Sequence, residues 1–477
     1  MDTKQAANVL DIQFDKDDRP KYVVLEGAIR AAVARGVLPS GSKLPPVRDL
    51  AWRIGVTPGT VARAYTRLTD TGLLTASVGR GTFVAPADAA AANLPEPRPL
   101  AVDATPHGTG GDVHDVNMLS PHLPSVGQAE LIRSLMAEIA ADPPSGLMHY
   151  PVHRTEGPAR AAAAAYLSSP DLGPVAPDDI VLTNGGQQAI ALVLQNVLTG
   201  RRPVVLLEEL TYPGFRRMAE TLRAEIVTVP IDAEGVRPDA LAAAARHGDA
   251  QILCTSPDAQ NPTCRRASEG RRREIVEVAR AANLQLLEDD CYMMTASGLP
   301  SYRLLAPERT WHVSSVAKTI TPALRLGFAL PPPDRRLALQ RTAEYNYFGL
   351  ATPMSDLAAK LLIHPQLNDL RDAARREVCR YTRAAAGILE GHDLAWQADI
   401  AFLWLGLPGG WRASAFCRAA EEVGVKLRAA EEFAGRDANA PHAVRLAVNC
   451  GVTLESFTAA IHRLRWLLDH PPEGLDV

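Results

Sequence analysis

The chain has 477 residues, with 50 lysines and arginines against 54 aspartates and glutamates, a formal net charge of −4 and 47% hydrophobic residues. This composition is typical of a soluble folded protein, and the length exceeds what one hydrophobic core usually holds, so we expect two or more domains. The six scattered cysteines lack the spacing of a zinc site or a disulfide framework and favour a reducing cytoplasm.

The sequence does not predict a membrane partner. No apolar run approaches the length that spans a bilayer. The first twenty residues are polar, with several acids and no apolar centre, so we do not expect a signal peptide. The small negative net charge does not itself predict nucleic-acid binding, although a basic domain can be hidden within such a sum.

Residues 19–86 are predicted to form a small domain of three helices and a hairpin. Apolar side chains recur at helical spacing over residues 22–35 and 46–54, and a glycine follows each segment. Thr57 can cap a third helix that begins at Pro58, where the missing N–H of proline costs nothing. Two short helices joined at a glycine turn have the outline of a helix-turn-helix.

A hairpin is predicted after these helices. Two strand-like runs, residues 73–78 and 81–84, flank Gly79 and Arg80, which places an arginine at the tip. Over residues 44–84 the motifs LPPVRDLA, GVT, TV, AY, GL and GRGTFV resemble the winged helix-turn-helix domain of the GntR family.

The GntR resemblance implies that this domain binds double-stranded DNA. Arg48 would contact phosphates, and Arg80 would reach the minor groove from the wing. The recognition helix would present three residues, namely Thr57, Thr60 and Arg63. Many family members have a basic or polar residue where this chain has a Pro-Gly pair after Thr57, so we expect base contacts from Arg63 and its neighbours instead.

Residues 87–115 are predicted to be a flexible linker. They are rich in alanine, proline, glycine and acids and show no periodicity. Such a segment cannot bury enough apolar surface to offset the entropy of ordering, so we expect an extended tether.

Residues 116–477 are predicted to form an α/β domain. Short apolar runs alternate with helical segments, and the runs are residues 180–182, 204–207, 252–254 and 284–287. This alternation predicts a mainly parallel sheet, in which ligands gather beyond the carboxyl ends of the strands. Polar or glycine-containing motifs follow each of the four runs.

The first three motifs offer groups for a flat, phosphorylated ligand. Gly185, Gly186 and Gln187 open a helix, where backbone N–H groups can approach a phosphate. Tyr212 offers a ring that can stack, and Asn261 offers an amide. Taken alone, a glycine pair and an Asn-Pro step are often only turns, and a single tyrosine is often a core or rim residue.

Lys318 lies in the segment SSVAKTITPALRLG, between Ser315 and Arg325. A lysine amine forms a Schiff base with an aldehyde when it is partly desolvated or has a cationic neighbour. The hydroxyl residues and Arg325 can hold a phosphate. Together these are the requirements of pyridoxal 5′-phosphate (PLP), although a lone lysine among serines is more often a solvated surface residue.

A carboxylate and a tyrosine complete this interpretation. Asp289 would face the pyridine nitrogen of PLP and keep it protonated, which makes the ring an electron sink. Asn261 and Tyr292 would bond to the phenolate oxygen. The alternative for the acids around Asp289 is a solvated loop.

The order and spacing of the motifs GGQ, YPG, NPT, DDxY, SxxK and RxG resemble those of fold-type I, aspartate aminotransferase-like PLP proteins. The resemblance implies that Arg445 grips a carboxylate bidentately. It also implies that Tyr150 reaches the phosphate in the neighbouring subunit's site, and hence that the protein is a homodimer. Cys264 stands where a glycine commonly follows the NPT motif.

A GntR-like winged helix-turn-helix, a linker and an aminotransferase-like body together resemble the MocR-type transcriptional regulators over essentially the whole chain. This resemblance implies a cytoplasmic, dimeric regulator that binds an operator with two half-sites and senses an amino-acid-like effector at Lys318 and Arg445. Two alternatives stay open. The first is that the chain is a catalytically active aminotransferase for an α-amino acid. The second is that PLP itself is the effector.

Overall fold

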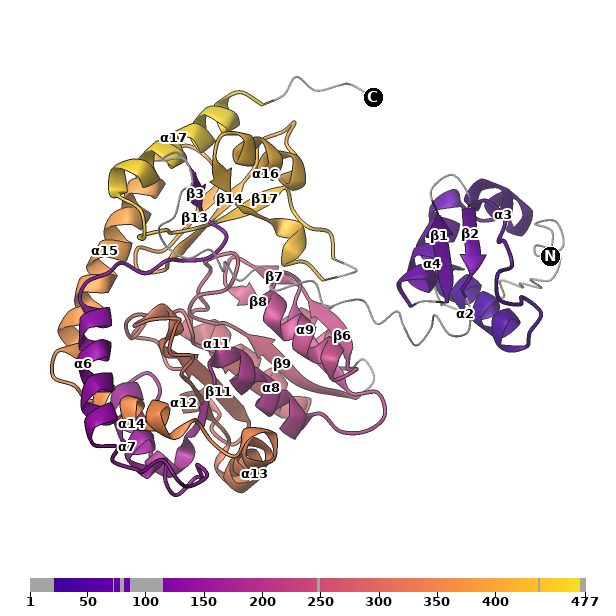
Figure 1. Cartoon of the computed structure of the whole chain (residues 1–477). Coiled ribbons are helices and arrows are strands. Elements are labelled where there is room, and N and C mark those ends of the chain that lie inside the picture. The colour runs from indigo at the N-terminus through magenta and orange to yellow at the C-terminus, as the bar shows by residue number, and fades with distance from the viewer. Residues whose placement is uncertain are drawn as a thin grey trace. The chain divides into compact units, whose positions relative to one another are not determined.

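The computed structural model describes residues 21–71, 73–77, 81–85, 115–246, 249–435 and 438–471. The chain divides into two compact units, Met1–Val102 and Asp103–Val477, which we call the head and the body (Figure 1). Arg80 lies outside the described residues, as does all of the predicted linker except residue 115.

The head consists of three helices and a hairpin, α2 (Lys21–Ala34), α3 (Val47–Ile54), α4 (Pro58–Asp70), β1 (Leu74–Ser77) and β2 (Gly81–Val84). The helices bury a small core that includes Leu25, Leu50 and Val61. The strands pair antiparallel, with Leu74 opposite Val84. The Thr57 hydroxyl accepts the N–H of Thr60, which confirms the predicted cap of α4.

The body is built on a seven-stranded sheet in the order β4-β12-β11-β10-β9-β5-β6. Its strands are β4 (Val181–Thr183), β5 (Val204–Glu208), β6 (Glu225–Val229), β9 (Ala250–Thr255), β10 (Gln285–Asp289), β11 (Thr310–Ser315) and β12 (Gly327–Leu330). All are parallel except β12, which runs antiparallel to both of its neighbours. The central strands are almost continuously apolar because both faces of the sheet are covered.

Helices cover the two faces of this sheet. Val205 and Leu207 pack with α8 (Gly186–Val197), α9 (Pro213–Thr221) and α13 (Arg336–Tyr347). Val204 and Leu206 point to the other face and pack with α10 (Pro238–Ala244) and α11 (Glu269–Ala281), beside α12 (Tyr302–Leu305). A further cluster at the β4 and β12 edge contains α6 (Gln128–Ala141), α7 (Gly157–Leu167) and α14 (Thr352–Leu361).

The remaining elements form a second region of the body, which we call the C-terminal lobe (Figure 1). Its four-stranded sheet has the order β13-β14-β17-β16, with β13 (Leu394–Ala395), β14 (Phe402–Gly406), β17 (Ala443–Ala447) and β16 (Arg428–Ala429). It packs against α15 (Leu367–Ile388), α16 (Ala413–Glu422) and α17 (Leu454–Asp469). The first strand of the body, β3 (Val116–Asn117), pairs with β15 (Val425–Lys426) of this lobe.

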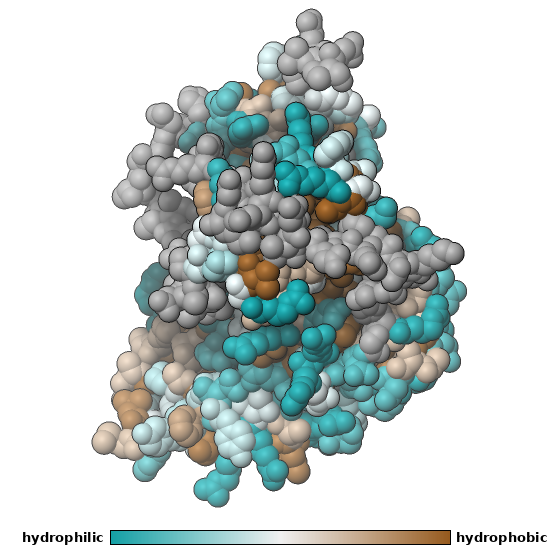
Figure 2. All heavy atoms as spheres, turned by 90° about the vertical axis from the view of Figure 1, so that its right-hand side faces the viewer, coloured by the Kyte–Doolittle hydropathy of each residue, from teal (hydrophilic) through white to brown (hydrophobic). Residues whose placement is uncertain are grey.

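Short elements complete the body. They are the strand pair β7 (Ile231–Asp232) and β8 (Gly235–Val236) and the 3₁₀ turns η1 (Pro177–Asp179), η2 (Val316–Lys318), η3 (Pro333–Arg335) and η4 (Ala430–Glu432). No helix among the described residues is long and apolar enough to cross a bilayer. Hydrophilic side chains predominate on the face drawn in Figure 2, where hydrophobic areas are small and separate.

The predicted fold class, a winged helix-turn-helix followed by an aminotransferase-like α/β domain, is confirmed. The four predicted runs become β4, β5, β9 and β10, each within one or two residues of the expected bounds. The antiparallel strand β12 and the sheet of the C-terminal lobe were not predicted, because their apolar runs are short and lack distinctive turn motifs.

Candidate cofactor site and DNA-binding surface

The predicted cofactor residues of the body lie along one edge of the large sheet. Gly185 follows β4, Tyr212 follows β5 and Asn261 follows β9. Asp289 ends β10, and Lys318 ends the turn after β11. Because β12 is antiparallel, Arg325, two residues before it, also comes to this edge. The site is therefore assembled by topology from segments that are far apart in the chain.

Lys318 is half-buried and faces an aromatic wall. Its Nζ lies 5.7 Å from the centroid of the Tyr292 ring. That ring in turn meets Phe402 of the C-terminal lobe edge-on, with centroids 5.0 Å apart. Ser315 is buried directly before the turn, and its hydroxyl accepts the N–H of Ala317.

The start of α8 is packed too closely for side chains. Gly185 has a φ of 84°, and a Cβ there would lie 2.6 Å from Nη2 of Arg325. A Cβ on Gly186 would lie 2.7 Å from Sγ of Cys291. The Arg325 guanidinium thus lies against the N-terminus of α8, an arrangement that fits an anion such as a phosphate.

Gln187 and Tyr212 are bonded to each other. The Tyr212 hydroxyl donates to Oε1 of Gln187 at 3.0 Å, and Nε2 of Gln187 donates to the carbonyl of Gly214. Burial raises the pKa of the Tyr212 phenol above its ordinary value. Gln187 therefore fixes the tyrosine ring, a contact that the sequence motif does not reveal.

Asp289 is a carboxyl group in a desolvated place. Its Oδ1 accepts the N–H of Cys291 at 3.0 Å. Burial raises the pKa of this carboxyl because it disfavours the ionised form. A cationic nitrogen that carries a proton would stabilise the carboxylate if it lay beside it. The chemistry of Asp289 fits a pyridinium N–H.

Asn261 and Arg445 meet across the body. Nη1 of Arg445 donates to Oδ1 of Asn261 at 2.8 Å, and Nη2 donates to the carbonyl of Leu119 at 2.7 Å. Both side chains are at most 4% exposed, and burial lowers the pKa of Arg445. In the described part of the chain, Nδ2 of Asn261 and Nε of Arg445 are buried without a hydrogen-bond partner. Two buried donors thus remain for a ligand that brings acceptors, which fits the phenolate and carboxylate expected here.

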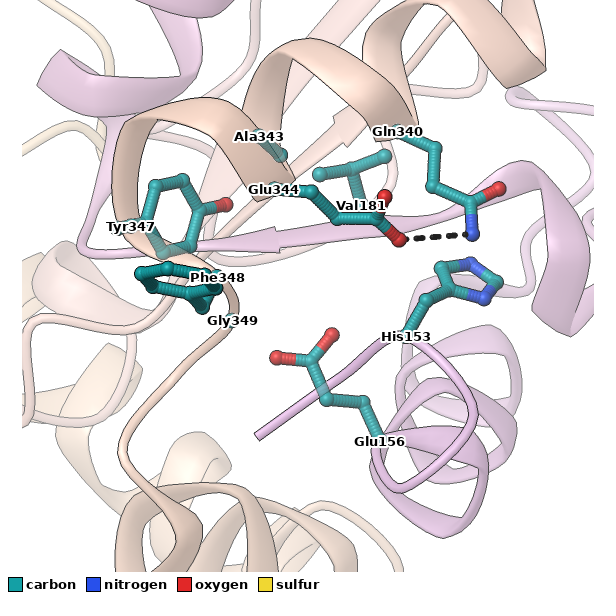
Figure 3. A pocket seen from close by; sticks show the side chains of 9 residues that line it. All are labelled: His153, Glu156, Val181, Gln340, Ala343, Glu344, Tyr347, Phe348 and Gly349. Carbon is teal, nitrogen blue, oxygen red and sulfur yellow. Dashed lines mark hydrogen bonds between the residues drawn. The ribbon is translucent and has the colours of Figure 1, made fainter. Parts of the chain in front are cut away.

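Tyr150 is not among the side chains gathered around Lys318. It is 78% exposed and packs against Phe348, with ring centroids 5.5 Å apart. Phe348 directly follows α13 and has a φ of 65°, and the N–H of Leu350 donates to Oε1 of the buried Glu156. Figure 3 shows Glu156 in the adjoining pocket, across from the end of α13. In one chain, Tyr150 therefore faces outward.

Glu208 supports the site through its contact with the turn before Asn261, and the sequence analysis did not identify it. It is buried at the end of β5, where its carboxylate accepts from the Thr255 hydroxyl and from Nε2 of Gln260. Burial raises the pKa of this carboxyl to about 7. Because Gln260 directly precedes Asn261, the hydrogen bond between Glu208 and Gln260 fixes the turn that carries the Asn261 amide. An acid closing the apolar run VVLL was the available signal.

The predicted DNA-contacting residues in the described part of the head lie on its surface. Arg48, Thr57 and Arg63 are exposed and Thr60 is half-buried. The Thr57 and Thr60 hydroxyls are 2.9 Å apart, so both take part in capping α4. The Arg63 guanidinium lies 4.3 Å from the centroid of the Tyr22 ring.

Comparison with known proteins agrees with both parts of the chain. The family model of aminotransferase class I and II matches residues 123–464, and that of bacterial regulatory proteins of the gntR family matches residues 21–84. The chain is 29% identical to the uncharacterized HTH-type transcriptional regulator YdeF of Bacillus subtilis, over 96% of each chain. It is 26% identical to the probable rhizopine catabolism regulatory protein MocR of Rhizobium meliloti, over 75% of this chain and 76% of that one.

Solved structures share the fold of the body. The kynurenine aminotransferase of Pyrococcus horikoshii, determined in complex with PMP, superposes with a TM-score of 0.67 at 20% identity. The match covers 76% of this chain and 92% of that one.

The chain therefore belongs to the aminotransferase class I and II family, whose members depend on PLP and are typically dimeric. It carries in addition the helix-turn-helix of the gntR family, whose regulators bind DNA. This combination is that of the MocR-type transcriptional regulators.

Proposed function

We propose that this protein is a DNA-binding transcriptional regulator that holds PLP on Lys318 and uses it to sense an amino-acid-like effector. The observation that carries the proposal is one chain in which a gntR-type head precedes a site where Lys318, Asp289, Asn261 and Arg445 converge. The regulator would act in the bacterial cytoplasm.

The residues around Lys318 would divide the work of holding PLP. The bound cofactor would supply an aldehyde and an electron-accepting ring. Lys318 would bind the aldehyde, and the Asp289 carboxylate would accept a hydrogen bond from the N–H of the pyridine ring. Nδ2 of Asn261 and the Tyr292 hydroxyl would donate hydrogen bonds to the phenolate oxygen. The phosphate contacts would come from the start of α8, Ser315 and Arg325, with Tyr212 stacked on the ring and fixed by Gln187.

Arg445 would bind the effector's carboxylate. Its Nε is buried and unpartnered in the described structure, and Asn261 and the Leu119 carbonyl fix its plane. A carboxylate can use such an oriented guanidinium at little entropic cost. Arg445→Ala should therefore leave PLP bound while weakening carboxylate ligands.

The proposed regulator is a homodimer on DNA. Tyr150 projects outward, as expected if it reaches the phosphate in the neighbouring subunit's site. Two heads per dimer would bind two half-sites at a fixed spacing. Arg48 would contact phosphates and Arg63 would contribute to base recognition, with Thr57, Thr60 and Arg80 beside them.

The test is binding of the purified full-length protein to DNA from upstream of its own gene and neighbouring genes, against random DNA. The titrations cover a salt series, with and without PLP. We expect a sequence preference that weakens with salt and shifts with PLP. Equal binding to random DNA in every condition would contradict the proposal.

A second candidate function is turnover as an aminotransferase. The same arrangement would serve it, because the predicted cofactor-facing side chains are all present and the Nε of Arg445 could bind a substrate carboxylate as well as that of an effector. Steady-state amino transfer to a keto acid, lost in Lys318→Ala, would support it. If PLP itself were the effector, Arg445→Ala would leave the DNA response to PLP unchanged.

A further inference from the structure

The long helix α15 belongs to two hydrophobic cores of the body. Near its start, Leu367 packs with the cluster that contains α7 and β12. From Ala374 onward its apolar residues pack in the core of the C-terminal lobe. Arg371 lies between these two stretches, so it is at the junction of the cores.

Arg371 contacts two segments that lie next to residues of the candidate cofactor site. Its guanidinium carbon lies 4.7 Å from the centroid of the Tyr166 ring on α7. Its Nη2 donates to the carbonyl of Met294 at 3.4 Å, two residues beyond Tyr292. Its Nε is buried without a hydrogen-bond partner in the described part of the chain. Arg371 is half-buried, and its guanidinium packs on the Tyr166 ring while one nitrogen bonds to the chain after Tyr292.

Tyr166 carries the contact onward to the lysine segment. Its hydroxyl and that of Thr319 are 2.9 Å apart. Thr319 is buried, directly follows Lys318, and closes the 3₁₀ turn through its N–H to Val316. A three-residue turn has few bonds of its own, so a side-chain bond at its end limits where Lys318 can point.

We propose that Arg371 and Tyr166 are positioning residues for the cofactor site. Arg371 orients the Tyr166 ring and the chain after Tyr292, and Tyr166 holds Thr319, so Lys318 and Tyr292 are kept in register by α15. This inference rests on the proposed binding of PLP at Lys318. Neither residue touches the cofactor, and both act through their neighbours.

The variants that test this role are Arg371→Met, Tyr166→Phe and Thr319→Val. Arg380→Met is the matched control, because Arg380 lies on the same helix with its guanidinium carbon 5.7 Å from the Tyr381 ring centroid. Full-length proteins are titrated with PLP by visible absorbance over a pH series. This yields the Kd for PLP and the pH midpoint of the spectral change, which a purely structural defect would not move. Thermal unfolding reports on the fold.

We expect Arg371→Met and Tyr166→Phe to weaken PLP binding about three- to tenfold and to shift the pH midpoint, since one hydrogen bond near the lysine is lost or misdirected. The double variant Tyr166→Phe with Thr319→Val should match the single variants, because both remove the same bond. Arg380→Met should behave as the parent.

Values for Arg371→Met and Tyr166→Phe that coincide with Arg380→Met, in Kd and in pH midpoint, would overturn the positioning role. If Arg371→Met fails to fold, Tyr166→Phe decides, since it removes a single oxygen atom. A parent protein that does not bind PLP would remove the proposed function and the positioning role together. If the parent binds PLP and no variant alters that binding, only the positioning role is overturned.

Discussion

Lys318 is the residue on which the cofactor proposal depends. Its amine faces the Tyr292 ring, and no other lysine lies in the motif segments at the sheet edge. Lys318→Ala should abolish the visible absorption of bound PLP and the adduct trapped by borohydride. Lys360→Ala, at a half-buried lysine paired with Glu138, is the control and should retain both. A trapped adduct that maps to another lysine would contradict the assignment.

Glu156 makes the stability of the body depend on pH. Burial raises the pKa of its carboxyl from 4.5 to about 7. A carboxyl whose pKa is raised on folding favours the folded state fully below its unfolded pKa, and this contribution is lost as pH rises through about 7. Glu156→Gln keeps an acceptor for the Leu350 N–H but cannot ionise.

We therefore expect Glu156→Gln to be more stable than the parent at about pH 8, by on the order of 2 kcal/mol, and equal to it near pH 4. Denaturant unfolding at both pH values measures the difference. Glu138→Gln, on the exposed side of α6, serves as the control. An equal gain at both pH values would assign the effect to packing rather than to ionisation.

Sequence motifs predicted which residues would gather, because parallel strands end at one edge of a sheet. Asp289 and Asn261 follow predicted apolar runs, so that rule places them at one edge, whereas Lys318 follows β11, which was not among the predicted runs. The rule does not reveal the supporting contacts. Tyr166 meets Thr319 across 153 positions and Arg445 meets Asn261 across 184, and no local pattern marks such pairs.

At the scale of elements, the start of α4 depends on the Thr57 hydroxyl. It accepts the N–H of Thr60, which also donates to the Thr57 carbonyl at 3.0 Å, in the first turn, where N–H groups lack partners four residues earlier in the helix. Thr57→Ala should cost α4 about 1 kcal/mol of local stability. Hydrogen exchange of α4 amides in the full-length protein measures this cost, and Thr66→Ala, an exposed position inside the same helix, should change exchange little. Equal protection in Thr57→Ala and the parent would show that the cap is unimportant.

The exposed face of α4 carries the proposed base contact. Arg63 lies in the second turn of the helix beside the Tyr22 ring, which limits its freedom before DNA binds. Arg63→Ala should reduce specific DNA binding by about 1 to 3 kcal/mol and relax the preference for the cognate site. Arg35→Ala, at an exposed position after α2, is the control. An unchanged ratio between cognate and random DNA would exclude base recognition by Arg63.

At the scale of the whole molecule, a sensor must couple its two units energetically. If PLP changes the affinity for cognate DNA by some factor, DNA must change the affinity for PLP by the same factor. Titrating PLP with and without saturating cognate DNA, and DNA with and without PLP, should yield equal factors. PLP binding that leaves DNA affinity unaltered would mean that the body does not regulate the head.

The Leu119 carbonyl has a practical consequence for dissecting this protein. It accepts hydrogen bonds from both Arg445 and Arg428, only four residues after Asp115, where the described body begins. The backbone that leaves the linker is thus part of the wall around the proposed carboxylate site. A shortened protein for ligand screening must start before β3, because cutting at the first helix of the body would remove one of the two hydrogen bonds that orient Arg445 and give misleadingly weak ligand affinities.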